Sequence, residues 1–145
     1  MEIHSLLPKY IDQIYEIEVA SFSVPWSINS LRDDLENPMA KYFVLTEGEE
    51  VLAYLGIRTV LDEIHIMNIA VKPEHRCKGY STLLMNELDK FAVDGKFYSI
   101  SLEVREGNEK ARNLYNKCGF ETCGVRKDYY EKPKENAILM VKYVK

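Results

Sequence analysis

The chain has 145 residues, of which 46% are hydrophobic and 29% charged, and its formal net charge is −4. This length predicts a single domain spanning residues 1–145, which buries enough surface to fold without disulfides or a metal. The charge lacks the positive excess that is typical of an extended nucleic-acid surface. We therefore expect no direct nucleic-acid partner.

The first residues of the chain and its cysteines indicate in which cellular compartment the protein works. Residues 1–5 lack the basic and apolar regions of a secretory signal, so we expect none, and because no apolar run approaches the length of a membrane span we expect no membrane partner. Cys77, Cys118 and Cys123 are odd in number and form no CxxC pair, which favours free thiols in a reducing, cytoplasmic compartment. No two histidines or cysteines have zinc-ligand spacing, so we expect no metal.

The first half of the chain predicts a weak strand, two helices and three further strands. In chain order these are a strand over 2–7, a helix from Pro8 to Phe22, a helix that Ser27 caps and Asn37-Pro38 closes, and strands over Tyr42–Thr46, Val51–Val60 and Ile64–Val71. Short turns join the last three strands, which is typical of an antiparallel meander.

The second half alternates helices and strands. The predicted elements are a helix over Gly79–Val93, a strand over Phe97–Val104, a helix over Glu109–Cys118 that Asn108 caps, strands over Phe120–Val125 and Ala137–Val144, and a polar loop over Asp128–Asn136. A strand-helix-strand crossover favours parallel neighbours. We therefore predict a mixed α/β fold: a mostly antiparallel central sheet of about seven strands with about four helices on its faces.

One loop combines features of a phosphate site. Between the strand that ends at Val71 and the helix that begins near Gly79, Arg76 and Lys78 place positive charge beside a helix N-terminus. Gly79 lets a ligand approach the backbone closely, which suits a pyrophosphate. The segment matches neither GxxxxGK[ST] nor GxGxxG, and taken alone it also fits a plain connection.

The same loop carries a family resemblance. Arg76-Cys77-Lys78-Gly79-Tyr80-Ser81 resembles the [RQ]-x-x-G-x-[GA] signature of the GNAT acetyltransferases, with Ser81 where glycine or alanine is usual. Further segments follow in the order typical of the ribosomal-protein-alanine N-acetyltransferase (RimI) branch: Pro25-Trp26-Ser27, Asn68–Val71, Leu102–Arg105, Asn108, Leu114-Tyr115, Gly119-Phe120 and Arg126–Tyr130. Gly107 departs from the serine that is common in the family. The resemblance covers nearly the whole chain.

The resemblance implies an N-acetyltransferase that takes acetyl from acetyl-CoA and passes it to the N-terminal alanine of a small-subunit ribosomal protein. It implies a pantetheine site along Ile69, Ala70 and Val71, a pyrophosphate site on Arg76, Cys77, Lys78, Gly79, Tyr80, Ser81 and Thr82, and a cofactor contact at Asn108. Trp26, Tyr129 and Tyr130 are the candidate acceptor contacts. We expect a monomer or a weak dimer.

Glu103 is the candidate general base. An α-ammonium group has a pKa of about 7.7–8.0, so a modest base suffices to give the neutral amine. Alternation with Ile100, Leu102 and Val104 puts Glu103 on the opposite strand face, and the resemblance implies that it accepts the proton, directly or through a water. The residues alone also allow a solvated glutamate that pairs with Arg105 or a nearby lysine.

Tyr115 is the candidate general acid. The departing thiolate needs a proton, which a nearby phenol can donate. Tyr115 shares a helix face with Asn108 and Ala111, although the residues alone also allow a core tyrosine. With this pair, acetyl passes directly to the amine and no acyl-enzyme forms.

Three other functions stay open from the sequence. The first keeps the cofactor and acetylates a small-molecule amine, such as a polyamine or an aminoglycoside. The second is a module that senses acyl-CoA without catalysis, and the third is a structural partner protein that binds no CoA. Retention of both Glu103 and Tyr115 disfavours the non-catalytic module.

Overall fold

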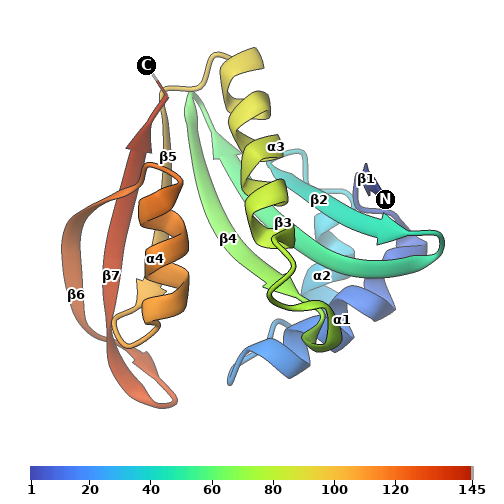
Figure 1. The fold of residues 1–145 in the computed structure, drawn as a ribbon, viewed down its shortest axis with the longest axis horizontal. Coiled ribbons are helices and arrows are strands. Elements are labelled where there is room, and N and C mark those ends of the chain that lie inside the picture. The colour runs from blue at the N-terminus through green and yellow to red at the C-terminus, as the bar shows by residue number, and fades with distance from the viewer. Residues whose placement is uncertain (145) are drawn as a thin grey trace.

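In the computed structural model, which describes residues 1–144, seven strands form one mixed sheet in the order β1-β2-β3-β4-β5-β7-β6 (Figure 1). The strands are β1 (Glu2–His4), β2 (Ala40–Glu47), β3 (Glu50–Val60), β4 (Glu63–Val71), β5 (Ser99–Arg105), β6 (Glu121–Glu131) and β7 (Lys134–Tyr143). Neighbouring strands are antiparallel except β4 and β5, which are parallel. The predicted mixed, mostly antiparallel class is confirmed.

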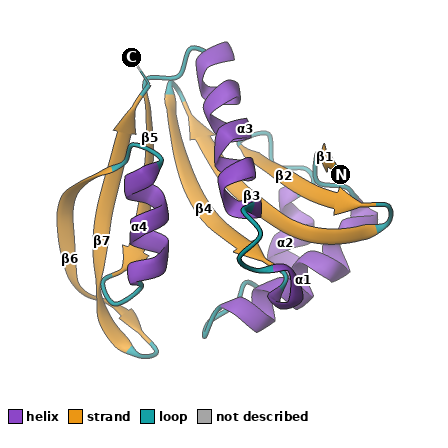
Figure 2. Cartoon of the chain, in the orientation of Figure 1, coloured by secondary structure: helices purple, strands orange, loops and turns teal. Residues whose placement is uncertain are grey.

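Helices lie on both faces of the sheet (Figure 2). They are α1 (Ile11–Ser21) and α2 (Ile28–Asp34) on one face, and α3 (Tyr80–Asp94) and α4 (Glu109–Lys117) on the other; two short 3-10 turns, η1 (Pro8–Tyr10) and η2 (Pro73–His75), precede α1 and α3. As predicted, the Ser27 side chain caps α2 by accepting the Ser30 N–H, and Asn108 caps α4 by accepting the Ala111 N–H.

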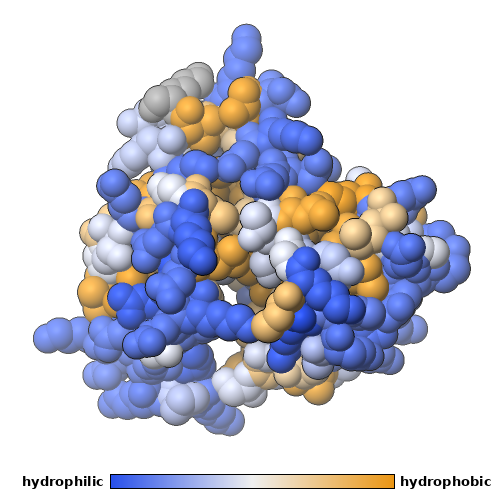
Figure 3. Space-filling model, in the orientation of Figure 1, coloured by the Kyte–Doolittle hydropathy of each residue, from blue (hydrophilic) through white to orange (hydrophobic). Residues whose placement is uncertain are grey.

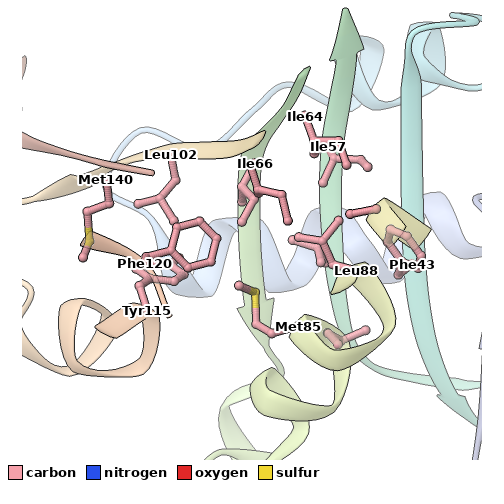
Figure 4. Packing of buried hydrophobic residues seen from close by; sticks show 14 of the residues in the cluster. Phe43, Ile57, Ile64, Ile66, Met85, Leu88, Leu102, Tyr115, Phe120 and Met140 are labelled. Atoms are coloured by element: carbon pink, nitrogen blue, oxygen red, sulfur yellow. The ribbon is translucent and has the colours of Figure 1, made fainter. Parts of the chain in front are cut away.

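The hydrophobic core under α3 and α4 runs without a break beneath both halves of the sheet. Figure 4 shows Tyr115, Phe120, Leu102 and Met140 facing the group formed by Ile66, Ile57, Leu88 and Phe43. The core under α1 and α2 is smaller, because its buried strand residues come from β2, β3 and β4 alone. On that second face, β5, β7 and β6 therefore contribute no buried residue to the cluster within residues 1–144.

The sheet splits between β4 and β5. The two strands pair only at Glu63↔Ser99, Ile64↔Ile100 and His65↔Ser101 within the described chain. Farther along β4, the register against β3 shifts between Gly56 and Ile57, and such a bulge bends and twists the strand that carries the extra residue. The rest of β4 therefore diverges from β5 and leaves a gap that opens toward one end of the sheet (Figure 1).

One predicted loop is instead a continuation of a hairpin. The sequence predicts a loop over Asp128–Asn136, but β6 runs to Glu131 and β7 starts at Lys134. The register between β6 and β7 shifts between Arg126 and Tyr130. Asp128 makes this irregularity feasible, because it adopts a φ of 51° and its N–H donates to the Asn136 side chain at 2.9 Å.

Candidate active site

The free edge of β4 forms one wall of the gap. Ile69, Ala70 and Val71 lie on the part of β4 that pairs with β3 alone within residues 1–144. Backbone N–H and C=O groups on the other edge of this stretch face the gap, where a ligand amide can pair with them as a strand would. Figure 3 shows the surface hollowed here, between α4 and the loop before α3.

The loop before α3 is shaped for close approach. Cys77 and Gly79 both have left-handed backbone, with φ values of 65° and 82°. A Cβ built on Gly79 meets nothing within 4 Å, so the space in front of the helix start is open. Tyr80, Ser81 and Thr82 form the first turn of α3, where backbone N–H groups lack helical partners and the helix dipole is positive. The arrangement suits an anionic ligand.

The cations of this loop are partly engaged with the protein. The Arg76 guanidinium donates to the Val71 carbonyl at 3.1 Å and to the Ser21 hydroxyl at 3.0 Å, which ties the loop to the ends of β4 and α1. Lys78 Nζ lies 3.4 Å from His75 Nδ1. From α4, Lys110 Nζ reaches to 3.5 Å from Cys77 Sγ, so α4 contributes a third cation to the loop.

Glu103 and Tyr115 lie on opposite faces of β5. Glu103 points away from Leu102, while Tyr115 packs in the α4-side core together with Leu102. A group held in the gap beside β5 therefore has the carboxylate on one side and the phenol on the other. This arrangement suits a direct transfer between two ligands.

The surroundings of Glu103 differ from the alternative that the sequence left open. Its cationic neighbour is Arg126 of β6, at 3.8 Å, and not Arg105. Interaction with the neighbouring Glu103 carboxylate is the main reason that the pKa of Tyr129 is raised. The Glu103 side chain keeps 20% of its surface exposed, so water and a ligand can reach it.

Tyr115 is a buried phenol. It is 6% exposed and packs edge-on against Phe120, with ring centroids 5.9 Å apart. Burial raises the pKa of Tyr115 well above its usual value, and the neighbouring Cys118 and Tyr130 add to the shift. The phenol therefore keeps its proton at neutral pH and is available as a proton donor.

The three predicted acceptor contacts occupy different settings. Trp26 lies in the α1–α2 loop, half-buried against the α1-side core. Tyr129 and Tyr130 pack edge to face at 5.1 Å, and they lie on β6 rather than on a loop. Burial and the charge of Glu103 raise the pKa of Tyr130 to about 12.

One acid beside the gap was missed from the sequence. Glu18 is fully buried and accepts hydrogen bonds from the Tyr54 hydroxyl, from Asn68 Nδ2 at 2.6 Å and from the Trp26 backbone N–H at 3.0 Å. It thereby fixes Asn68 on β4 and the start of the α2 segment. The signal was its position four residues after Ile14, a charged residue on the apolar face of α1.

A surface cavity lies elsewhere. About 530 Å³ in volume, it lies among β1, β2 and α3, lined by residues that include Ile3, Lys41 and Glu87. It is remote from Glu103 and Tyr115, so we assign the site to the split in the sheet. Within residues 1–144, no group of three His, Cys, Asp or Glu side chains is placed to hold a metal ion, and no helix is long and apolar enough to cross a membrane.

Comparison with known proteins gives a consistent result. Residues 11–120 match the model of the acetyltransferase (GNAT) family. A Haemophilus ducreyi protein named [ribosomal protein bS18]-alanine N-acetyltransferase is 35% identical, over 98% of this chain and 99% of its own length. A Bacillus subtilis protein that carries this name provisionally is 39% identical over 90% of this chain and 87% of its own. The crystal structure of the Escherichia coli ribosomal-protein-S18-alanine N-acetyltransferase superposes with a TM-score of 0.91 at 29% identity, covering 99% of this chain and 93% of that one.

Proposed function

We propose that this chain, which belongs to the acetyltransferase (GNAT) family and is an acetyl-CoA-dependent N-acetyltransferase, acetylates the α-amino group of the N-terminal alanine of ribosomal protein bS18. The observation that carries the chemistry is the split in the sheet, with Glu103 and Tyr115 on opposite faces of β5. The names of the relatives support the acceptor. We propose a single catalytic domain over residues 1–145 that works in the cytoplasm as a monomer or a weak dimer.

The residues around the gap divide the binding of acetyl-CoA among them. We propose that the β4 edge at Ile69, Ala70 and Val71 pairs with the pantetheine amides, and that the loop from Arg76 to Thr82 holds the pyrophosphate. The side-chain oxygen of Asn108 caps α4. We therefore propose that Asn108 contributes to the cofactor site by holding the first turn of α4 beside it. Acetyl-CoA supplies a thioester carbonyl, the electrophile that the amine attacks.

In the proposed mechanism, the two side chains move one proton each. Glu103 accepts a proton from the acceptor ammonium, directly or through a water, and the neutral amine nitrogen forms the C–N bond. The C–S bond breaks, and Tyr115 donates its phenolic proton to the departing sulfur. The nitrogen loses its second proton to solvent as the amide forms, Tyr115 regains a proton from solvent, and Glu103 releases the proton it accepted, so the net products are an amide, a thiol and one released proton.

The proposed acceptor approaches from the face that carries Glu103. We propose that Trp26 of the α1–α2 loop and Tyr129 and Tyr130 of β6 form the walls that hold the peptide. We propose that the phenol of Tyr129, which interacts with the Glu103 carboxylate, orients it. This leaves the α3–α4 face to the cofactor and the opposite face to the amine.

The deciding experiment measures free-thiol release from acetyl-CoA with short peptides that differ only at residue one. Spermidine and an aminoglycoside run beside them, and mass spectrometry locates the acetyl group. We expect a peptide that begins with the bS18 sequence, alanine first, to be the best substrate. Turnover confined to the free amines overturns the acceptor, and cofactor binding without turnover of any acceptor, including whole bS18, overturns the enzymatic function.

A further inference from the structure

The two halves of the sheet, which diverge after His65 and Ser101, meet again at the far end of the gap. Ser23, in the α1–α2 loop, donates from its hydroxyl to the Lys132 carbonyl at the tip of the β6–β7 hairpin, at 2.5 Å. Arg105, the last residue of β5, places Nη2 3.4 Å from the same hydroxyl. Segments 109 residues apart in sequence are thus joined across the opening.

Arg105 is the centre of this junction. Nη1 donates to the Pro133 carbonyl at 2.9 Å, and Nη2 donates to the Lys132 carbonyl at 3.1 Å. The guanidinium also stacks over the Tyr130 ring, 4.2 Å from its centroid. A planar fork with several donors suits two adjacent carbonyls and an aromatic face, which a lysine ammonium does not match. We call the group Ser23, Arg105, Lys132 and Pro133 the clasp.

Glu135 extends the clasp to the cofactor side. One carboxylate oxygen lies 3.3 Å from Arg105 Nη1, and the other accepts the Gly107 N–H at 2.5 Å. A Cβ built on Gly107 comes within 2.7 Å of that second oxygen, so glycine permits this approach. Gly107 directly precedes Asn108, the cap of α4, and α4 carries Tyr115.

We propose that Arg105 is a positioning residue that closes the acceptor side of the gap into a ring, so that the acceptor enters as the free end of a single extended chain. The inference rests on the proposed function. Glu103 precedes Arg105 by two residues and shares its strand face, so an amine that reaches Glu103 passes beneath the clasp. When the clasp opens, the hairpin tip and the α1–α2 loop separate and lose their grip on the peptide.

The first test replaces Arg105 and follows the two substrates separately. In Arg105→Gln we expect the KM of the alanine peptide to rise about tenfold, since charge-assisted hydrogen bonds that hold the hairpin are lost. The kcat and the KM of acetyl-CoA change less than about twofold, because the reacting groups and the β4 edge stay in place. Arg105→Lys keeps the charge and still raises the peptide KM. Arg112→Gln on α4 is the matched control, because it removes a partly buried arginine that donates to the Glu106 carbonyl and touches no residue of the clasp.

A second test needs no acceptor. Hydrogen exchange of residues 22–27 and 128–136 accelerates together in Arg105→Gln and not in Arg112→Gln. Gly107→Ala displaces Glu135 while keeping Arg105, and it gives a smaller change in the same direction. Unchanged exchange, or a KM of acetyl-CoA that rises as much as that of the peptide, overturns the clasp. If exchange accelerates but wild-type enzyme turns over no alanine peptide, the clasp as a closure stands and the proposed acceptor alone fails.

Discussion

The two halves of the sheet bury their acidic side chains differently. Strands β2 to β4 have helices on both faces, and Glu18 is enclosed there with three hydrogen-bond donors. Strands β5, β7 and β6 have α4 on one face, and no helix in residues 1–144 contributes to a core on the other, where Glu103 stays 20% exposed. The enclosed carboxylate is fixed in place, whereas the open one remains accessible to a substrate. The same residue type thus serves architecture in one half and, in the proposed mechanism, chemistry in the other.

The largest effect is expected when the open carboxylate of Glu103 is removed. Glu103→Gln keeps the shape of the side chain but cannot accept a proton, so we expect kcat/KM at pH 7 to fall by about 10³-fold. The loss shrinks as the pH rises past the amine pKa of about 8, because the acceptor then deprotonates unaided. A pH–rate profile checks this. A loss that stays constant from pH 6 to 10, a range of roughly two units on either side of that pKa, contradicts the role of general base.

The next largest effect is expected when the enclosed carboxylate of Glu18 is removed. Glu18→Ala leaves the Tyr54 hydroxyl, the Asn68 amide and the Trp26 N–H without their acceptor in a buried site, so we expect unfolding to become easier by about 3 kcal/mol. Urea denaturation measures the change. The matched variant Glu103→Ala costs less than about 1 kcal/mol, as is usual at partly exposed sites. Equal losses in the two variants remove the distinction between the halves.

A smaller effect follows from the buried phenol. Tyr115→Phe retains the ring that packs on Phe120 and deletes only the proton donor, so we expect kcat to fall about thirtyfold with little change in acetyl-CoA affinity. Tyr10→Phe, which deletes the hydroxyl of a buried tyrosine in the other half, is the control. Because burial raises the pKa of Tyr115, wild-type kcat does not decline through its ionisation in the mildly alkaline range. Unchanged turnover in Tyr115→Phe contradicts the role of Tyr115 as general acid.

The smallest effect concerns a charge pair that joins the two halves. Lys142 on β7 lies 3.0 Å from both carboxylate oxygens of Asp89 on α3. Both side chains are partly exposed, so Lys142→Ala costs at most about 1 kcal/mol. Thermal unfolding at low and high salt measures it, since screening weakens such a pair. If Lys142→Ala lowers stability as much as Glu18→Ala does, then this ion pair, and not the shared hydrophobic core, holds the two halves together.

Local patterns predicted most of the elements, and distant contacts account for what was missed. The alternation around Glu103 and the caps at Ser27 and Asn108 depend on neighbouring residues, so they were readable. Two of the three partners of Glu18, Tyr54 and Asn68, lie 36 and 50 residues away, beyond any local pattern. The register shift that bends β4 and the positive φ of Asp128 likewise arise from strand pairing.

The sequence placed Glu103 and Tyr115 on the correct elements, but it did not predict the contacts of the site residues. Arg105 was a candidate partner of Glu103, and it instead pairs with Glu135. Tyr129 and Tyr130 were expected on a loop, whereas they occupy a strand. Side-chain pairing across the gap depends on where the two halves meet again, and nothing in the spacing of either segment encodes that meeting.

Because the β4–β5 ladder is short, the binding of acetyl-CoA and the stability of the fold are coupled. Three residue pairs are a weak seam for a sheet of this width, and the missing rungs lie where pantetheine is proposed to sit. A ligand that supplies those rungs binds the folded chain and not the unfolded one. At a ligand concentration of a hundred times its Kd, this binding raises the free energy of unfolding by about 2.7 kcal/mol. In the proposed binding mode, acetyl-CoA makes the protein more resistant to unfolding than the empty chain, and we expect free CoA, which keeps the pantetheine arm, to do the same.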